Sequence, residues 1–441
     1  MYTITDLGTL PTGVSSNATG INNLGQVTGS ADIFTGFYYP GRAFLWTQRT
    51  GMQDLGLLPC LDFCWDNYEM YFSSVATGVN DLGIVSGWSW INPINDSAFI
   101  WSPEQGMLDL GTIAGKYTMH AEALNRFGQV AGTAYQGPGG LGPAIAFTWT
   151  SAGGSQSLGS LPGAEYSYAL DINDLGQIVG SAEIPSYCRC QYHAFSWKKN
   201  TGMQDLGTLG GTGSESGATA INAFGQVVGW SEGHAFRSAA NTPINAATDD
   251  LGPGTATDID DYGQVVGRLV DGTSALYSNG QWHDLNNLIS PGSTCDSVWV
   301  VAINDAGQMA ANANCNGQSH AVRLDPIYRG VVQQPINADG SSVLNAHRGV
   351  VPLKFVVTQS GYQSCTLPAS IAVTRASAGT LAALDESTYS MSADNGSLFR
   401  IDPNACQYVY NLAASSLGVG TYRVDISING IMVGHAVFAL K

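Results

Sequence analysis

The chain has 441 residues, a net charge of −17 and 44% hydrophobic residues, and glycine occurs 55 times. The hydrophobic content excludes a disordered chain, and the negative charge disfavours nucleic acid as a partner because a polyanion would be repelled. The sequence also lacks an apolar run of about 18 residues, which excludes a membrane span. Only 12% of the residues are charged, which together with abundant glycine is typical of a turn-rich, all-β protein.

The first predicted element is a single strand, Tyr2 to Leu7, which follows the initial methionine directly. No secretory signal sequence precedes this strand, so we interpret the sequence as that of a processed or trimmed chain.

One phrase then recurs seven times, with its asparagine or aspartate 38 to 58 residues from the next one. The first copy reads Ile-Asn-Asn-Leu-Gly-Gln-Val, and the copies begin at Ile21, Val79, Leu124, Ile172, Ile221, Ile259 and Ile303. Asparagine favours the start of a type I turn, and glycine favours the left-handed position of a G1 bulge. Each copy therefore predicts a tight hairpin. A calcium loop is the weaker interpretation, because the alternating carboxylates of such a loop are missing.

Two further phrases accompany each hairpin and complete a unit of four strands. An Ala-aromatic segment such as Ala43–Trp46 predicts the third strand, and Met-Gln-Asp-Leu-Gly predicts the fourth. Four strands in about 40–50 residues is the size of a propeller blade. The seventh unit lacks a fourth strand, which Tyr2–Leu7 can supply. We therefore predict a seven-bladed β-propeller over residues 1–325, with an open β-solenoid or a pair of sandwiches as the alternative.

The repeats resemble the HAF family of bacterial extracellular repeats, whose His-Ala-Phe stands here at His193 and His234. The resemblance covers residues 1–325 and is weakest at Ser274 and His320, where the aromatic residue is missing. It implies export and an extracellular or cell-surface location. It implies no catalytic residues.

Residues 328–441 lose all three phrases and form a second predicted domain. Val350–Phe355 resembles the Val-Pro-x-Lys-Phe signature of an immunoglobulin-like module appended to bacterial secreted proteins. Gly418 to Leu440 alternates apolar and polar residues across Asn429-Gly430, which predicts a hairpin. The resemblance implies an immunoglobulin-like β-sandwich that serves as a spacer or an attachment unit.

Eight cysteines in a chain with five lysines favour disulfide bonds and an oxidising compartment. We predict the pairs Cys60–Cys64, Cys188–Cys190, Cys295–Cys315 and Cys365–Cys406. The Cys188–Cys190 pair is the weakest, because one intervening residue forces an unusual backbone, and a redox pair is its alternative. Zinc is disfavoured because no histidine pair accompanies the cysteines, and we expect no metal and no cofactor.

The variable insertions fall between the second and third strands and between one repeat and the next, so they lie on one face of a propeller. We call this the decorated face, and we call the opposite face, with its short turns, the plain face. Long loops on a rigid scaffold commonly carry function, and aromatic and carboxylate side chains on this face suit a sugar ligand. The candidate ligand-binding residues are Asp62, Trp65, Asp66, Glu69, Tyr71, Trp88, Trp90, Tyr117, His120, Glu122, Tyr166, Tyr168 and Tyr187. The alternative is that these aromatic residues pack within their own loops.

No nucleophilic signature in the sequence is convincing, and no zinc-protease motif or phosphate loop is present. The leading hypothesis is a secreted or cell-surface binding or adhesion protein whose decorated face binds a glycan or an extracellular protein. The first alternative is a polysaccharide-active hydrolase or lyase with carboxylates on the same face. The second is a structural subunit that self-associates in an extracellular assembly.

Overall fold

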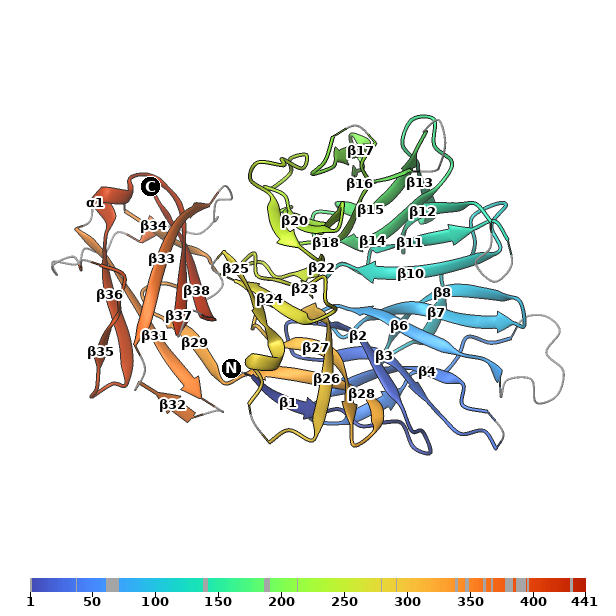
Figure 1. The fold of residues 1–441 in the computed structure, drawn as a ribbon, viewed down its shortest axis with the longest axis horizontal. Coiled ribbons are helices and arrows are strands. Elements are labelled where there is room, and N and C mark those ends of the chain that lie inside the picture. The colour runs from blue at the N-terminus through green and yellow to red at the C-terminus, as the bar shows by residue number, and fades with distance from the viewer. Residues whose placement is uncertain are drawn as a thin grey trace. The chain divides into compact units, whose positions relative to one another are not determined.

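The computed structural model describes most of the chain. It covers residues 2–36, 38–60, 71–137, 142–185, 191–211, 213–278, 280–290, 292–337, 340–345, 349–359, 362–365, 368–376, 384–385, 394, 396–428 and 431–441. Two compact units are present, one spanning Ile4–Asp325 and one formed by Pro326–Lys441 with Met1–Thr3. Both are built from β-strands (Figure 1), so the predicted all-β class is confirmed.

Four-stranded antiparallel sheets make up the larger unit. The first three are β2 (Ser16–Ile21), β3 (Val27–Asp32), β4 (Gly41–Thr47) and β5 (Gly51–Asp54); β6 (Ser74–Val79), β7 (Val85–Asn92), β8 (Asn95–Ser102) and β9 (Gly106–Asp109); and β10 (Thr118–Leu124), β11 (Val130–Tyr135), β12 (Ala144–Thr150) and β13 (Gly154–Gly159). The next three are β14 (Ser167–Ile172), β15 (Ile178–Ile184), β16 (Gln191–Lys198) and β17 (Gly202–Gly207); β18 (Ser216–Ile221), β19 (Val227–Ser231), β20 (His234–Arg237) and β21 (Asp250–Pro253); and β22 (Thr255–Ile259), β23 (Val265–Arg268), β24 (Ser274–Ser278) and β25 (Gln281–Asp284). A short 3-10 helix, η3 (Leu285–Asn287), follows β25.

The last sheet combines the two ends of the larger unit. It contains β26 (Cys295–Ile303), β27 (Met309–Cys315) and β28 (Gln318–Pro326), and its fourth strand is the N-terminal β1 (Tyr2–Asp6), which lies beside β28 (Figure 1). The Leu7 amide donates to the Ala321 carbonyl at 3.1 Å, and the His320 ring bonds the Asp6 carboxylate. The N-terminal strand therefore occupies the place that the sequence predicts for it.

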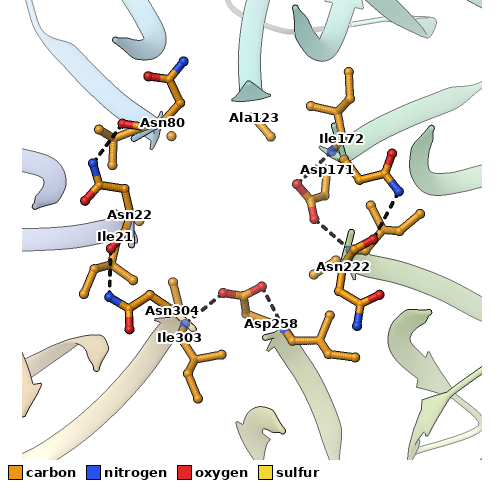
Figure 2. Close-up of a pocket in the computed structure, with 18 of the residues that line it drawn as sticks. Ile21, Asn22, Asn80, Ala123, Asp171, Ile172, Asn222, Asp258, Ile303 and Asn304 are labelled. Atoms are coloured by element: carbon orange, nitrogen blue, oxygen red, sulfur yellow. Dashed lines mark hydrogen bonds between the residues drawn. The ribbon is translucent and has the colours of Figure 1, made fainter. Parts of the chain in front are cut away.

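The core of each sheet follows from the repeated phrases. In the first five sheets the alanine and the following phenylalanine of the third strand are fully buried, as at Ala43–Phe44 and Ala98–Phe99. The glycine of the second strand admits no side chain: a Cβ at Gly29 would lie 1.8 Å from the Asn17 carbonyl oxygen. Neighbouring sheets pack through these small and aromatic residues, and the first strand of each sheet lines a central channel (Figure 2).

Two five-stranded sheets form the smaller unit. One has the order β29 (Tyr328–Gln333), β31 (Val350–Gln359), β36 (Gln407–Ala413) and β35 (Arg400–Asp402), with β32 (Tyr362–Ser364) paired to β31. The other has the order β33 (Ala369–Ala376), β37 (Gly420–Ile428), β38 (Ile431–Leu440), β30 (Ser342–Leu344) and β34 (Leu384–Asp385), and α1 (Ala414–Leu417) links β36 to β37. Buried side chains from both sheets, including Phe355, Tyr408, Tyr422 and Phe438, share one core. The predicted hairpin is present as β37 and β38.

Two predicted disulfides lie in the described part of the chain. Cys295–Cys315 has a Cα separation of 4.0 Å and Cys365–Cys406 one of 5.2 Å. The first pair links directly opposed residues of β26 and β27. Cys60 is disulfide-bonded, while Cys64, Cys188 and Cys190 lie outside the described residues.

Candidate functional site

The asparagine of the repeated phrase organises the plain end of the channel. In the first sheet the Asn22 carbonyl accepts the Gly25 amide at 3.0 Å, and its side-chain oxygen accepts the Leu24 and Gln26 amides. Gly25 has φ of 72°, the left-handed conformation that the G1 bulge requires. The predicted hairpin geometry is therefore present at this turn.

The same side chain also links one sheet to the next, which the sequence analysis does not foresee. Asn22 Nδ2 donates to the Asn80 carbonyl at 2.8 Å, and the donation repeats around the channel (Figure 2). Six residues donate in this way over 2.8–3.2 Å: Asn22, Asn80, Asn125, Asn173, Asn222 and Asn304. Asn304 donates back to the Asn22 carbonyl. We call these six residues the asparagine ring.

Asp260 occupies the seventh position and changes the local hydrogen bonds. A carboxylate cannot donate to the next carbonyl, and here the Gln264 amide is turned so that its Nε2 donates to Asp260 Oδ2 at 2.6 Å. As a result, Gln264 Oε1 is buried without a hydrogen-bond partner in the structure as described.

Two aspartates line the channel where other repeats have glycine or alanine. Asp171 accepts the Ile172 and Ile221 amides, and Asp258 accepts the Ile259 and Ile303 amides (Figure 2). Each carboxylate therefore joins two neighbouring sheets. Burial raises the pKa of Asp171 to about 6. Burial, with repulsion from Asp171, raises the pKa of Asp258 to about 7.

A third carboxylate, Glu122 of β10, lies in the channel wall and is close to His120. Burial raises the Glu122 pKa to about 7, although the charge of His120 lowers it. His120 Nε2 lies 3.0 Å from Asp96 Oδ2. The His120 ring stacks on Trp88 at a centroid distance of 4.7 Å and meets Tyr135 edge-on at 5.4 Å. A histidine, two carboxyl groups and a phenol thus gather at the decorated end of the second and third sheets.

An exposed aromatic cluster lies on the decorated face of the first sheet. Phe34, Tyr38 and Tyr39 belong to the connection between β3 and β4, and Tyr71 precedes β6. Their exposed fractions are 44%, 47%, 52% and 39%. Phe34 and Tyr39 have ring centroids 5.0 Å apart, and Tyr38 and Tyr71 have centroids 4.4 Å apart. We call these four residues the aromatic platform.

The structure places the predicted site residues in three groups. Tyr71 and Tyr117 are exposed, whereas Trp88, Trp90, His120, Glu122, Tyr166 and Tyr168 are half-buried. The residues Asp62, Trp65, Asp66, Glu69 and Tyr187 lie outside the described part of the chain. Trp88, Trp90, His120, Glu122 and Tyr168 lie on strands rather than in the predicted loops, because these strands continue past the repeated phrases. Sequence reasoning missed Phe34, Tyr38, Tyr39 and Asp96, although a dense aromatic run marks the first three.

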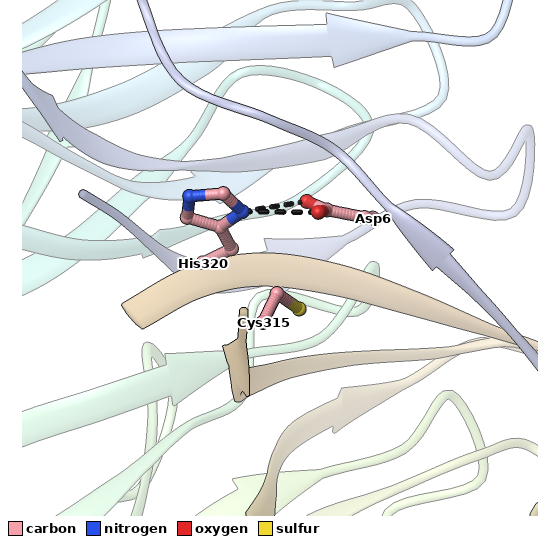
Figure 3. A group of neighbouring side chains, drawn as sticks. All are labelled: Asp6, Cys315 and His320. Carbon is pink, nitrogen blue, oxygen red and sulfur yellow. Dashed lines mark hydrogen bonds and ion pairs between the residues drawn. The ribbon is translucent and has the colours of Figure 1, made fainter. Parts of the chain in front are cut away.

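Histidines of the third strands pair with aspartates of the fourth strands. His193 pairs with Asp205, His234 with Asp250 and His320 with Asp6, all at 2.9–3.0 Å. This recurrence supports a structural role for the histidines. Ligand atoms of Asp6, Cys315 and His320 lie within 4.8 Å of one another (Figure 3), but the Cys315 sulfur is bound to Cys295 and offers no thiolate while that bond is intact.

Comparisons with known proteins give a likeness of fold only. No protein-family model and no curated protein matches the chain. A gluconolactonase from Xanthomonas campestris matches 73% of this chain and 89% of its own with 10% identity and a TM-score of 0.34. A putative oxidoreductase (glucose dehydrogenase) from Thermus thermophilus matches 74% of this chain and 100% of its own with 12% identity and a TM-score of 0.28. Within the described residues, no helix is long and apolar enough to span a membrane.

Proposed function

We propose that this chain is an extracellular glycan-binding protein whose decorated face holds the ligand. Residues 1–325 would then form one closed seven-bladed propeller, supported by the seven four-stranded sheets of the described residues and by the return of the asparagine ring to Asn22. Residues 328–441 would form the immunoglobulin-like module that the Val-Pro-x-Lys-Phe resemblance implies. The two disulfides are consistent with an oxidising compartment.

The aromatic platform carries this proposal. Aromatic rings that serve only to fill a loop are expected to be buried within it, yet all four rings are at least 39% exposed. Flat apolar faces held against one another by ring contacts lose little conformational entropy on binding. Such faces stack on the apolar sides of sugar rings, while the phenol groups of Tyr38, Tyr39 and Tyr71 can bond sugar hydroxyls.

A glycan array followed by titration calorimetry tests the proposal. Tyr38→Ala and Tyr71→Ala are each expected to weaken binding roughly five- to tenfold, about 1–1.5 kcal/mol for one lost ring contact. Phe127→Ala is the control, because Phe127 is an even more exposed aromatic residue and lies on the plain face. The proposal would lose its basis if neither tyrosine substitution changed the glycan affinity, or if no glycan bound.

A second candidate function is acid–base catalysis on a glycan at Glu122. The supporting observation is a carboxyl group with a pKa of about 7 beside His120, which suits proton transfer near neutral pH. Product analysis after incubation with the glycans that bind should then show new chain ends. Glu122→Gln should abolish their release while leaving glycan binding within about twofold; chain cleavage that survives this substitution excludes Glu122 as the acid–base group.

A further inference from the structure

The residue directly before the turn glycine is large and apolar in six of the seven repeats. These residues are Leu24, Leu82, Phe127, Leu175, Phe224 and Tyr262. The first four are among the most exposed apolar side chains of the described chain, at 68%, 70%, 69% and 73%. They lie on four consecutive turns of the plain face, and we call them the apolar arc.

The turn itself does not require an apolar side chain at this position. Leu24 and Phe127 contribute their backbone amides, which donate to Asn22 and Asn125, while their side chains stay outside the core. Four large apolar side chains exposed on one face offer area that a partner could cover. Because the asparagine ring ties consecutive turns together, the arc is presented on a rigid support.

The apolar arc borders an acidic opening. Asp81 and Asp174 line the channel at two turns of the arc, and Asp261 and Asp305 line it at the turns of the sixth and seventh repeats. Glu122, Asp171 and Asp258 also line this cavity of about 370 Å³. Among the described residues that line this channel, Arg126 is the one cation, and it pairs with Asp174. The Glu122 side chain lines this cavity, so a donor that entered the channel could bind there.

We propose that the plain face docks a protein segment in which a lysine or arginine is flanked by apolar residues. The cationic group enters the acidic channel, and its apolar neighbours cover Leu82, Phe127 and Leu175. A second copy of this chain fits less well, because it would bring a second set of the same carboxylates to the interface and like charges repel.

Titration of the full chain with short blocked peptides tests this proposal. The probe is Gly-Leu-Leu-Lys-Leu-Leu-Gly, followed by fluorescence anisotropy up to millimolar peptide. Acetylation of the lysine and replacement of the leucines by serine are each expected to weaken binding at least tenfold, since they remove the charge and the apolar contact respectively. Raising the salt concentration should also weaken binding.

The protein variants separate the plain face from the glycan site. The double variant Leu82→Ser with Leu175→Ser should lose at least tenfold in peptide affinity and keep its melting temperature, because both side chains are exposed. Tyr38→Ala on the other face is the control and should bind the peptide normally. The proposal is overturned by equal binding of the acetylated peptide, by no binding at millimolar concentration, or by dimers in sedimentation that the leucine substitutions disperse. A protein that binds the peptide but no glycan would contradict the proposed glycan-binding function and not this peptide-docking proposal.

Discussion

Asp260→Asn is expected to stabilise the larger unit by completing the asparagine ring. The new amide can donate to the Asn304 carbonyl, as the other six residues do toward their neighbours. Gln264 can then turn its Oε1 toward the new amide, which gives a partner to an acceptor that is now buried without one. The substitution also removes a carboxyl group that is 3% exposed.

The size of the effect follows from the groups involved. A satisfied hydrogen bond contributes about 1 kcal/mol, and relief of an unsatisfied buried acceptor contributes about 1–3 kcal/mol. Against this, the bonds from the Tyr262 and Gln264 amides lose the strength that a charged acceptor gives them, roughly half of their contribution. The net gain is about 1–2 kcal/mol.

Urea unfolding followed by tryptophan fluorescence measures this gain. Asn173→Asp is the matched control, because it places an aspartate at the ring position of the fourth repeat, as Asp260 does in the sixth. It should lower the unfolding free energy by about 1–3 kcal/mol, since it removes the donation to Asn222 and buries a charge. A destabilised Asp260→Asn protein, or an Asn173→Asp protein as stable as the wild type, would show that the ring bonds contribute nothing to stability.

Three further predictions concern closure, pH and the disulfides. Deletion of residues 1–7 removes β1 and the Asp6–His320 pair and leaves β28 as an open edge, so aggregation in light scattering and a lower melting temperature are expected; unchanged melting would contradict closure by β1. Asp171 and Asp258 have pKa values raised in the folded state from 3.8 to about 6 and about 7, so their contribution to stability is complete at pH below 3.8 and is lost as pH rises from about 4 to about 7. The unfolding free energy should therefore fall over that range, and Asp258→Asn should flatten the fall; a slope unaffected by this substitution excludes Asp258 as its source. Reduction of Cys295–Cys315 and Cys365–Cys406, which close 20- and 41-residue separations, should cost about 3 and about 4 kcal/mol on the loop-entropy description, and denaturation of the two cysteine-to-serine pairs tests each bridge separately.

Local patterns in the sequence predict the strands and turns well, because the residues that favour each strand and turn lie within a single repeat. Asn22 and Gly25 lie three residues apart and define a turn without help from the rest of the fold. The bond from Asn22 to Asn80 could not be predicted in this way, because it depends on the distance between two hairpins that are 58 residues apart in the chain.

The candidate site shows the same limit. Trp88 and His120 are predicted as site residues, but the stacking of their rings and the edge-on contact of His120 with Tyr135 depend on how three strands align across two sheets. Asp96, which bonds His120, has no sequence signal because it lies in a different repeat. Phe34, Tyr38 and Tyr39 were within reach of sequence reasoning, since the aromatic run stands in an insertion between two predicted strands.

The pairing of β1 with β28 has a consequence for biogenesis. The strand that is synthesised first finds its partner more than 300 residues later, so every sheet between them can assemble while the ring is still open. Until the chain has been made as far as Pro326, the N-terminal strand lacks its partner and exposes edges that accept a foreign strand. A holdase chaperone that covers Tyr2–Asp6 during synthesis would therefore act where the molecule is most exposed to misassembly.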